Sequence, residues 1–178
     1  MKSENNKKSY LITGVSGSGK STVCKELKKR NFEAHDVEDI DGLFEMYHKG
    51  TNKIFEEYDN ANPEHIKGAE WNCDIDKLKK LIVAQKSEIA FYCGIASNMN
   101  EVVGLFDKFF VLKSSKVSLN NRLKNREGTD DIGNNQKGRD VVLGWKDWWE
   151  EEMQKQGGIL IEANDSSENI TNDILGMI

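Results

Sequence analysis

Short apolar runs alternate with longer amphipathic segments along the chain. Short β-like runs, of which 32–37 is the least apolar, predict five strands at residues 9–15, 32–37, 88–94, 109–112 and 159–163. Between them, apolar residues recur at helical spacing, for example Ile75, Leu78 and Ile82. This alternation is typical of an α/β fold with a mainly parallel sheet.

Capping and breaking residues place the predicted helices. They span residues 20–30, 75 onward, 98 to about 106, 115 to about 127, 140–156, and a last helix that begins at Ser166 or Ser167. Asn98 with Glu101 three residues later is typical of a helix start. The helical spacing of Trp145, Trp148 and Trp149 predicts packing in the core and at the lid edge rather than base stacking. A polar stretch at residues 128–138 predicts a mobile loop.

Composition favours one soluble domain that spans residues 1–178. We find no internal repeat and no long linker, and the chain is 37% hydrophobic and 31% charged. The net charge of −5 offers no general basic footprint, so we expect no nucleic-acid partner. The basic clusters at residues 25–30 and 77–80 are interpreted as solvated helix faces.

The cysteines indicate the redox state of the thiols, and the lengths of the apolar runs indicate where the protein is located. Cys24, Cys73 and Cys93 are odd in number and widely spaced, which argues against a disulfide framework or a zinc site and predicts free buried thiols. Residues 1–8 are polar, and no run approaches the roughly 18 apolar residues that a membrane span needs. We therefore expect a cytoplasmic protein without a membrane partner, as a monomer or homodimer.

One motif carries a specific chemical signal. Residues 14–22 match the phosphate-binding pattern G-x-x-x-x-G-K-[ST] in full, with a strand before and a helix after. The backbone N–H groups and the helix start would face phosphates, Lys20 would contact the β and γ phosphates, and Ser21 would bind Mg²⁺. The predicted nucleotide-binding residues are Gly14, Val15, Ser16, Gly17, Ser18, Gly19, Lys20, Ser21 and Thr22.

Three classes of P-loop protein compete: a small-molecule kinase, a GTPase switch and a motor-type ATPase. The guanine-reading N-K-x-D is not complete, because Asn52-Lys53 is followed by Ile54-Phe55. A motor-type ATPase would end its third strand in a carboxylate, where this chain has Cys93-Gly94. Both departures favour the kinase class.

Acidic residues follow the second predicted strand, from Asp36 through Glu38 and Asp39 to Asp41. In an α/β fold this point lies at the carboxyl edge of the sheet, where ligands bind. Carboxylates there can hold Mg²⁺-bound water and accept the proton of an attacking hydroxyl. The alternative is a solvated acidic turn at a helix start.

Two arginines precede the polar loop. Arg122 and Arg126 are four residues apart on one helix, so they share a face. A hinged lid at about residues 126–139 could bring these cations over the transferred phosphate and exclude water. The alternative is that both arginines pair with nearby surface acids.

The chain resembles the shikimate kinase, gluconate kinase and adenylate kinase group of P-loop kinases. The resemblance rests on GVSGSGKST, the acid-rich end of the second strand, the FYCG strand, the RLKNR helix before a polar lid, and the closing ILIEAND strand. It implies a three-layer α/β/α sandwich in which five parallel strands have the order 2-3-1-4-5. It also implies a D-x-D pair that falls on Asp36, which reaches Mg²⁺ through water, and on Glu38, which contacts the acceptor hydroxyl. Glu38 departs from the family's aspartate, and Asp39 is the alternative.

A second departure concerns the acceptor. The Gly-Gly-Gly run of shikimate kinases is replaced by Gly94-Ile-Ala-Ser-Asn98, and few arginines are present to grip a carboxylate, so shikimate is not expected. The acceptor would bind at about residues 39–72, where Tyr47, Tyr58, His65, Trp71 and Asn72 could contact a ring or sugar, or simply pack.

The sequence thus predicts ATP- and Mg²⁺-dependent phosphoryl transfer to a hydroxyl or phosphate of a nucleoside, nucleotide or sugar-like compound. Lys20, Glu38, Asp39 and Arg126 are the predicted catalytic residues, Arg122 adds to the nucleotide site, and Ser21 and Asp36 are the predicted metal site. An ATPase or a regulatory ATP-binding protein without a small-molecule acceptor is the alternative.

Overall fold

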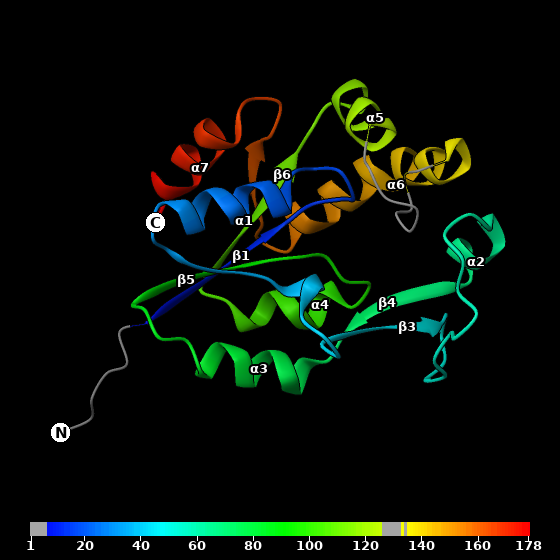
Figure 1. Cartoon of the computed structure of the whole chain (residues 1–178), viewed down its shortest axis with the longest axis horizontal. Helices are drawn as coiled ribbons and strands as arrows, with labels where there is room; N and C mark the ends of the chain where they lie inside the picture. Colours follow the sequence, from blue (N-terminus) through cyan, green and yellow to red (C-terminus); the bar gives the residue numbers. More distant parts are fainter. Residues whose placement is uncertain (1–6, 126–132, 134) are drawn as a thin grey trace.

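The structure is a computed structural model of the 178-residue chain, and it describes residues 7–125, 133 and 135–178. A parallel sheet forms its centre (Figure 1). Its strands are β1 (Lys8–Thr13), β2 (Glu33–Asp36), β5 (Ile89–Cys93), β6 (Lys108–Lys113) and β7 (Ile159–Glu162). All four strand pairs are parallel, which confirms the predicted α/β class.

The strands lie in the order β2-β5-β1-β6-β7. When only the strands of this sheet are counted along the chain, the order is the expected 2-3-1-4-5. The labels differ because two further strands, β3 and β4, form a separate sheet that the sequence did not predict. The order places β1, and therefore the loop that follows it, between β5 and β6.

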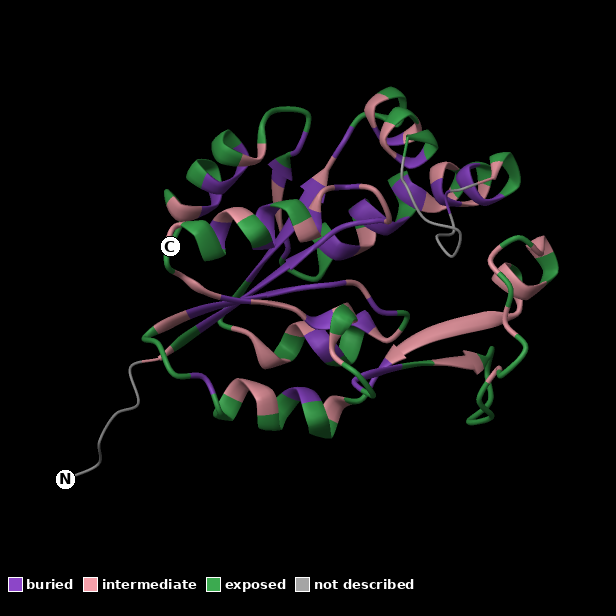
Figure 2. Cartoon of the chain, viewed as in Figure 1, coloured by how far each residue is buried: buried purple, intermediate pink, exposed green. Residues whose placement is uncertain are grey.

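Helices cover both faces of the sheet and form the three expected layers (Figure 1). On one face, buried residues of α1 (Lys20–Lys29) and α7 (Ser167–Leu175) pack in one hydrophobic cluster with Phe91 and Phe110. On the other face, a second cluster contains residues of α3 (Ile75–Val83), α4 (Met99–Val102), α5 (Lys116–Lys124) and α6 (Gln136–Lys155). The strands between the two layers are the most buried part of the molecule (Figure 2).

A lobe projects from the sheet between β2 and α3. The 3₁₀ turn η1 (Val37–Asp39) leads into β3 (Phe44–His48), which pairs antiparallel with β4 (Ala69–Cys73). The short helix α2 (Pro63–Lys67) precedes β4 and contacts α6 (Figure 1). This lobe, residues 41–74, covers most of the segment predicted to bind the acceptor, and we call it the acceptor lobe.

Three local predictions were wrong. The helix α6 begins at Gln136 rather than Asp140, because the Asn135 side chain caps it by accepting a hydrogen bond from the Gly138 amide at 2.8 Å. The predicted loop and lid are therefore helical from Gln136 onward, and residues 126–132 and 134 lie outside the described residues.

The other two corrections concern single side chains. Trp148 is 62% exposed and so lies outside the core, whereas Trp149 is buried as expected. Asn98 precedes α4 but its side chain does not cap that helix.

The predictions for the cysteines and for two helix caps are confirmed. Cys24, Cys73 and Cys93 are free and buried. Ser115 and Ser166 cap α5 and α7 through their side chains. Among the described residues, no helix combines the length and apolar character that crossing a membrane requires. The short 3₁₀ turn η2 (Val103–Leu105) completes the helical segment that begins at α4.

Candidate active site

The predicted phosphate-binding loop connects the buried strand β1 to α1. Gly17 and Gly19 have positive φ angles of 83° and 106°, a backbone conformation that residues with a Cβ rarely adopt. Gly19 occupies the N-cap position of α1, so the first amides of that helix border the loop. A Cβ on Gly14 would lie 2.4 Å from Ser18 Oγ, so the loop closes on itself only with glycine there. This path suits phosphate oxygens bound by backbone N–H groups.

Lys20 lies inside this loop and is 8% exposed. Its Nζ donates a hydrogen bond to the Gly14 carbonyl at 2.9 Å and lies 3.6 Å from Glu38 Oε1. The ammonium group is therefore held between the start of the phosphate loop and the acidic turn after β2. These are two of the sites that the sequence predicted separately, and the fold brings them together.

Glu38 is positioned by the end of β5. Its Oε1 also accepts a hydrogen bond from the Ile95 amide at 3.0 Å. Gly94 makes this approach possible, because a Cβ there would lie 2.5 Å from Val37 Cγ2 and 3.3 Å from Glu38 Cγ. The glycine after the FYC strand was therefore the sequence signal for this contact. A side chain at position 94 would push η1 away from β5. Asp39, the alternative base, is exposed in the same turn.

Ser21 and Asp36 supply the oxygen atoms predicted to hold Mg²⁺. Ser21 lies in the first turn of α1, and Asp36 ends β2 opposite Cys93, the last residue of β5. In the part of the chain that the structure describes, no group of three or more His, Cys, Asp or Glu side chains could hold a metal alone. A hydroxyl and a carboxylate nevertheless fit Mg²⁺, which keeps several waters and takes phosphate oxygens from its nucleotide.

Two buried thiols lie beneath this edge of the sheet. A hydrogen bond between Cys24 of α1 and Cys93 of β5 lowers the pKa of Cys24 and raises that of Cys93, and burial raises the pKa of Cys93 further. Cys93 therefore stays a neutral thiol at the point where β5 leads into Gly94.

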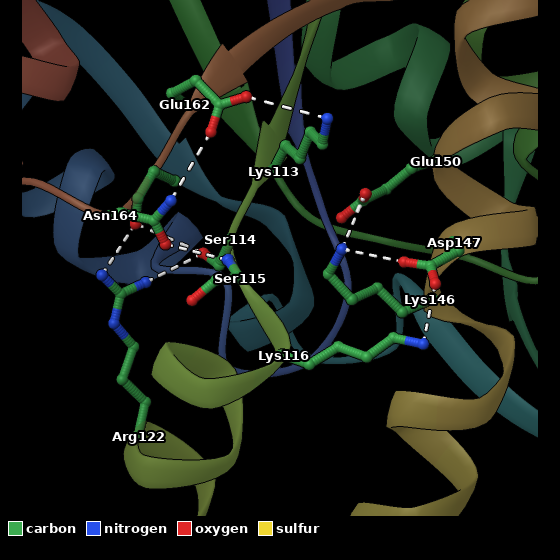
Figure 3. Close-up of polar contacts among 11 residues, drawn as sticks. Lys113, Ser114, Ser115, Lys116, Arg122, Lys146, Asp147, Glu150, Glu162 and Asn164 are labelled. Carbon is green, nitrogen blue, oxygen red and sulfur yellow. Dashed lines mark hydrogen bonds and ion pairs between the residues drawn. The ribbon is translucent and has the colours of Figure 1, made fainter.

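Arg122 reaches the loop from α5. Its guanidinium donates to the Ser18 carbonyl at 3.3 Å, to Ser114 Oγ at 3.1 Å and to the Ala163 carbonyl at 2.7 Å. It therefore joins the phosphate loop to the carboxyl ends of β6 and β7. Figure 3 shows its guanidinium beside Ser114. Its predicted companion, Arg126, lies outside the described residues.

Charged side chains form ion pairs on α5 and α6, the two helices on either side of the predicted lid. Lys116 of α5 pairs with Asp147 of α6 at 2.7 Å, and Lys146 Nζ lies 2.8 Å from Glu150 (Figure 3). Lys146 and Glu150 are both buried. Burial raises the pKa of Glu150, although Lys146 opposes that shift. The Lys116–Asp147 pair thus links α5 to α6, whereas Lys146 pairs with Asp147 and Glu150 within α6.

The sequence did not predict how the acceptor lobe is attached. Asn98 Oδ1 accepts from the Cys73 amide at 2.9 Å, and Asn98 Nδ2 donates to the Cys73 carbonyl at 3.0 Å. Ser97 makes a similar pair of bonds with Trp71, through its amide at 2.7 Å and its hydroxyl at 2.9 Å. The loop at residues 94–98 thus binds both β4, through Ser97 and Asn98, and Glu38, through the Ile95 amide. Local sequence carries no signal for bonds between residues so far apart.

The aromatic residues proposed as acceptor contacts mostly pack within the lobe. Trp71 stacks on Phe44 at 5.4 Å between ring centroids, next to the core. Tyr58 and His65 surround Phe55 at centroid distances of 5.7 and 4.9 Å. These contacts favour the packing interpretation for Tyr58, His65 and Trp71.

Comparisons with known proteins agree with this geometry. A family model described as an AAA domain matches residues 11–142. The chain is 35% identical over 133 residues to an adenylate kinase isoenzyme 6 homolog from Plasmodium falciparum, and the match covers 70% of this chain and 69% of that protein. This chain belongs to the AAA-domain family and, within it, to the P-loop small-molecule kinases.

Solved structures share the fold of this P-loop kinase family member at low sequence identity. A deoxyadenosine kinase from M. mycoides with bound dATP matches with a TM-score of 0.56 and 16% identity, over 94% of this chain and 97% of that one. A gluconokinase from Sinorhizobium meliloti 1021 matches with a TM-score of 0.54 and 15% identity, over 95% and 90%. At these identities the matches establish the fold and leave the acceptor open.

Proposed function

We propose that the protein catalyses ATP- and Mg²⁺-dependent transfer of a phosphoryl group to a hydroxyl or phosphate of a small molecule. The observation that carries this proposal is the position of Lys20, between the Gly14 carbonyl and the Glu38 carboxylate. A cation for the γ-phosphate and a base for the attacking group thus lie side by side, as phosphoryl transfer requires. The kinase relatives support the same reaction class.

Each predicted residue has a role in this proposal. The backbone of residues 14–19 binds the triphosphate, and Lys20 neutralises charge on the β and γ phosphates. Ser21 and Asp36 would hold Mg²⁺, which would supply positive charge to the phosphates. Glu38, held in place by the Ile95 amide, accepts the proton of the attacking hydroxyl. Arg122 of α5 adds positive charge beside the phosphate loop, and Arg126 keeps the catalytic role that the sequence predicts for it.

ATP is the proposed donor because the chain has no complete guanine-reading N-K-x-D sequence. At a given concentration, a ligand that binds only the native state raises the melting temperature more when it binds more tightly. We expect ATP with Mg²⁺ to raise the melting temperature more than GTP with Mg²⁺. Equal or larger stabilisation by GTP would contradict the base preference.

The proposal is tested by screening candidate acceptors for ADP release above the background without acceptor. A kinase gives a large increase that depends on the acceptor, whereas an ATPase gives the same rate with or without it. Lys20→Ala serves as the control for contaminating activity, since it removes the charge aimed at the phosphates.

A further inference from the structure

The acceptor side of the site contains carboxylates and no arginine. Between residues 31 and 121, which the structure describes throughout, the sequence contains no arginine. Within this stretch, residues 31–74 carry twelve aspartates and glutamates but only three lysines, Lys49, Lys53 and Lys67. The whole chain has a net charge of only −5. Negative charge is therefore concentrated in β2, η1 and the acceptor lobe, the elements that lead away from Glu38.

The described arginines are engaged elsewhere. Arg30 bonds to Glu26 at 3.1 Å and to Asn172 of α7 at 2.6 Å, on the opposite face of the sheet from the acceptor lobe. Arg122 spans the phosphate loop and β7. Arg139 bonds to the Gly133 carbonyl at 3.1 Å and to Gln136 at 2.9 Å.

The lysines of the acceptor side do not lie beside Glu38 either. Lys77 Nζ donates to the Gly42 carbonyl at 2.7 Å, and Lys67 pairs with Glu64 of α2 at 3.1 Å. Lys49 and Lys53 follow β3, whose five residues run away from the sheet (Figure 1). At about 3.3 Å per residue, the far end of β3 is roughly 15 Å from its start. The nearby cation, Lys20, faces the triphosphate site.

These charges decide which acceptor can bind next to Glu38. Proteins usually hold a phosphate or carboxylate with arginine, whose planar fork forms two hydrogen bonds with it. Among the described residues, an anionic acceptor here would meet Glu38, Asp39 and Asp41 without such a partner, and like charges brought together weaken binding. A hydroxyl or ammonium group instead donates hydrogen bonds to these carboxylates.

We infer that the acceptor is a hydroxyl compound without a phosphate or carboxylate group, either uncharged or bearing an amine. This inference rests on the proposed phosphoryl-transfer function and narrows it. In the step, the acceptor oxygen forms a bond to the γ-phosphorus, the bond to the ADP oxygen breaks, and the hydroxyl proton passes to Glu38. The hydroxyl of such a compound is the group that receives phosphate.

The test separates acceptors by charge. An aqueous yeast extract is passed over an anion exchanger, which retains phosphates and carboxylates and lets uncharged and amine-bearing compounds through. Each fraction is incubated with the full chain, Mg²⁺ and ATP labelled in the γ-phosphate, and labelled organic phosphate is measured. Two pairs of pure compounds are assayed in the same way: adenosine and AMP, and glucose and gluconate. In each pair the first compound is uncharged and the second is an anion. The Lys20→Ala protein gives the background.

We expect labelled product from the unretained fraction at about tenfold or more above that from the retained one, which corresponds to about 1.4 kcal/mol of discrimination. Equal or greater transfer to the retained fraction, or to AMP or gluconate over their partners, would overturn the inference and leave the kinase function standing. No transfer above background from either fraction would contradict the proposed function itself, and the inference with it.

Discussion

The ammonium group of Lys20 lies 3.6 Å from Glu38 Oε1, so the phosphate loop and the acidic turn after β2 form one site. We expect Glu38→Gln to lower kcat by about 10²–10⁴-fold, because glutamine cannot accept the proton of the attacking hydroxyl. Glutamine keeps an oxygen for the Ile95 amide, so the turn should stay in place. The KM for ATP should therefore change little.

Steady-state kinetics with a responsive acceptor measure this effect. Glu101→Gln is the matched control, since Glu101 is an exposed carboxylate on α4. If Glu38→Gln keeps normal kcat while Asp39→Asn loses it, Asp39 is the base and our assignment of Glu38 is wrong.

Gly94 allows the close approach of η1 to β5. We expect Gly94→Ala to destabilise the protein by about 1–3 kcal/mol, because the new Cβ would lie 2.5 Å from Val37 Cγ2 and one of the two must move. The urea midpoint of unfolding measures this. Gly104→Ala is the control, since a Cβ there meets nothing within 4 Å and should change stability by less than about 0.5 kcal/mol. Equal effects of the two substitutions would refute the packing argument.

Asn98 attaches the acceptor lobe by bonding both backbone polar groups of Cys73. Asn98→Ala should cost about 1–3 kcal/mol, since it leaves that amide and carbonyl without these partners. It should also raise KM for the acceptor more than KM for ATP, because β4 is loosened while the phosphate loop is untouched. Asn100→Ala, at an exposed position of α4, is the control. A parallel rise in both KM values would indicate a general structural defect.

Asp74 makes the stability of α3 depend on pH. Its Oδ1 caps the helix by accepting from the Lys77 amide at 3.0 Å, and this bond, with the Lys77 charge, lowers the pKa of Asp74. A carboxyl whose pKa is lowered on folding stabilises the native state above its ordinary pKa of 3.8, and loses that contribution as the pH falls through the native value. Asp74→Ala should therefore lower the urea midpoint near neutral pH and do so less in acid.

Asp173→Ala provides the comparison for that experiment, because Asp173 is exposed near the end of α7 and does not cap it. The difference between wild type and Asp74→Ala should shrink with acidification, and Asp173→Ala shows how much removing an exposed aspartate changes the urea midpoint by itself. A gap for Asp74→Ala that is constant with pH would contradict the capping role of the carboxylate.

Local sequence signals were sufficient for the parallel sheet. The strands β1, β5 and β6 are mostly buried apolar runs, whereas β2 buries only Ala34 and was placed by its position after the first helix. Residues 14–22 match the phosphate-binding motif in full. The β3–β4 pair escaped prediction because its strands are separated by twenty residues and are mostly half-buried, so they lack the alternation that marks a strand. The start of α6 was missed because Gly138 disfavours a helix, whereas the Asn135 cap stabilises it there.

In the site, too, some features could be predicted from local sequence and others could not. The residue types at Lys20, Glu38 and Arg122 were predictable from motif and spacing. The contact of Glu38 with the Ile95 amide and that of Arg122 with the Ala163 carbonyl were not, because each joins segments more than forty residues apart through a backbone group. Arg126 stays a prediction, since it lies outside the described residues.

The most direct test of the account follows the labelled γ-phosphate of ATP. With wild-type protein, Mg²⁺ and a responsive acceptor, the label should appear in the phosphorylated acceptor rather than in inorganic phosphate. Lys20→Ala should lose this transfer while keeping its fold by circular dichroism, because Lys20 supplies charge to the phosphates. Label that goes to inorganic phosphate at the same rate with every acceptor would contradict the kinase assignment, and normal transfer by Lys20→Ala would contradict the role of the loop.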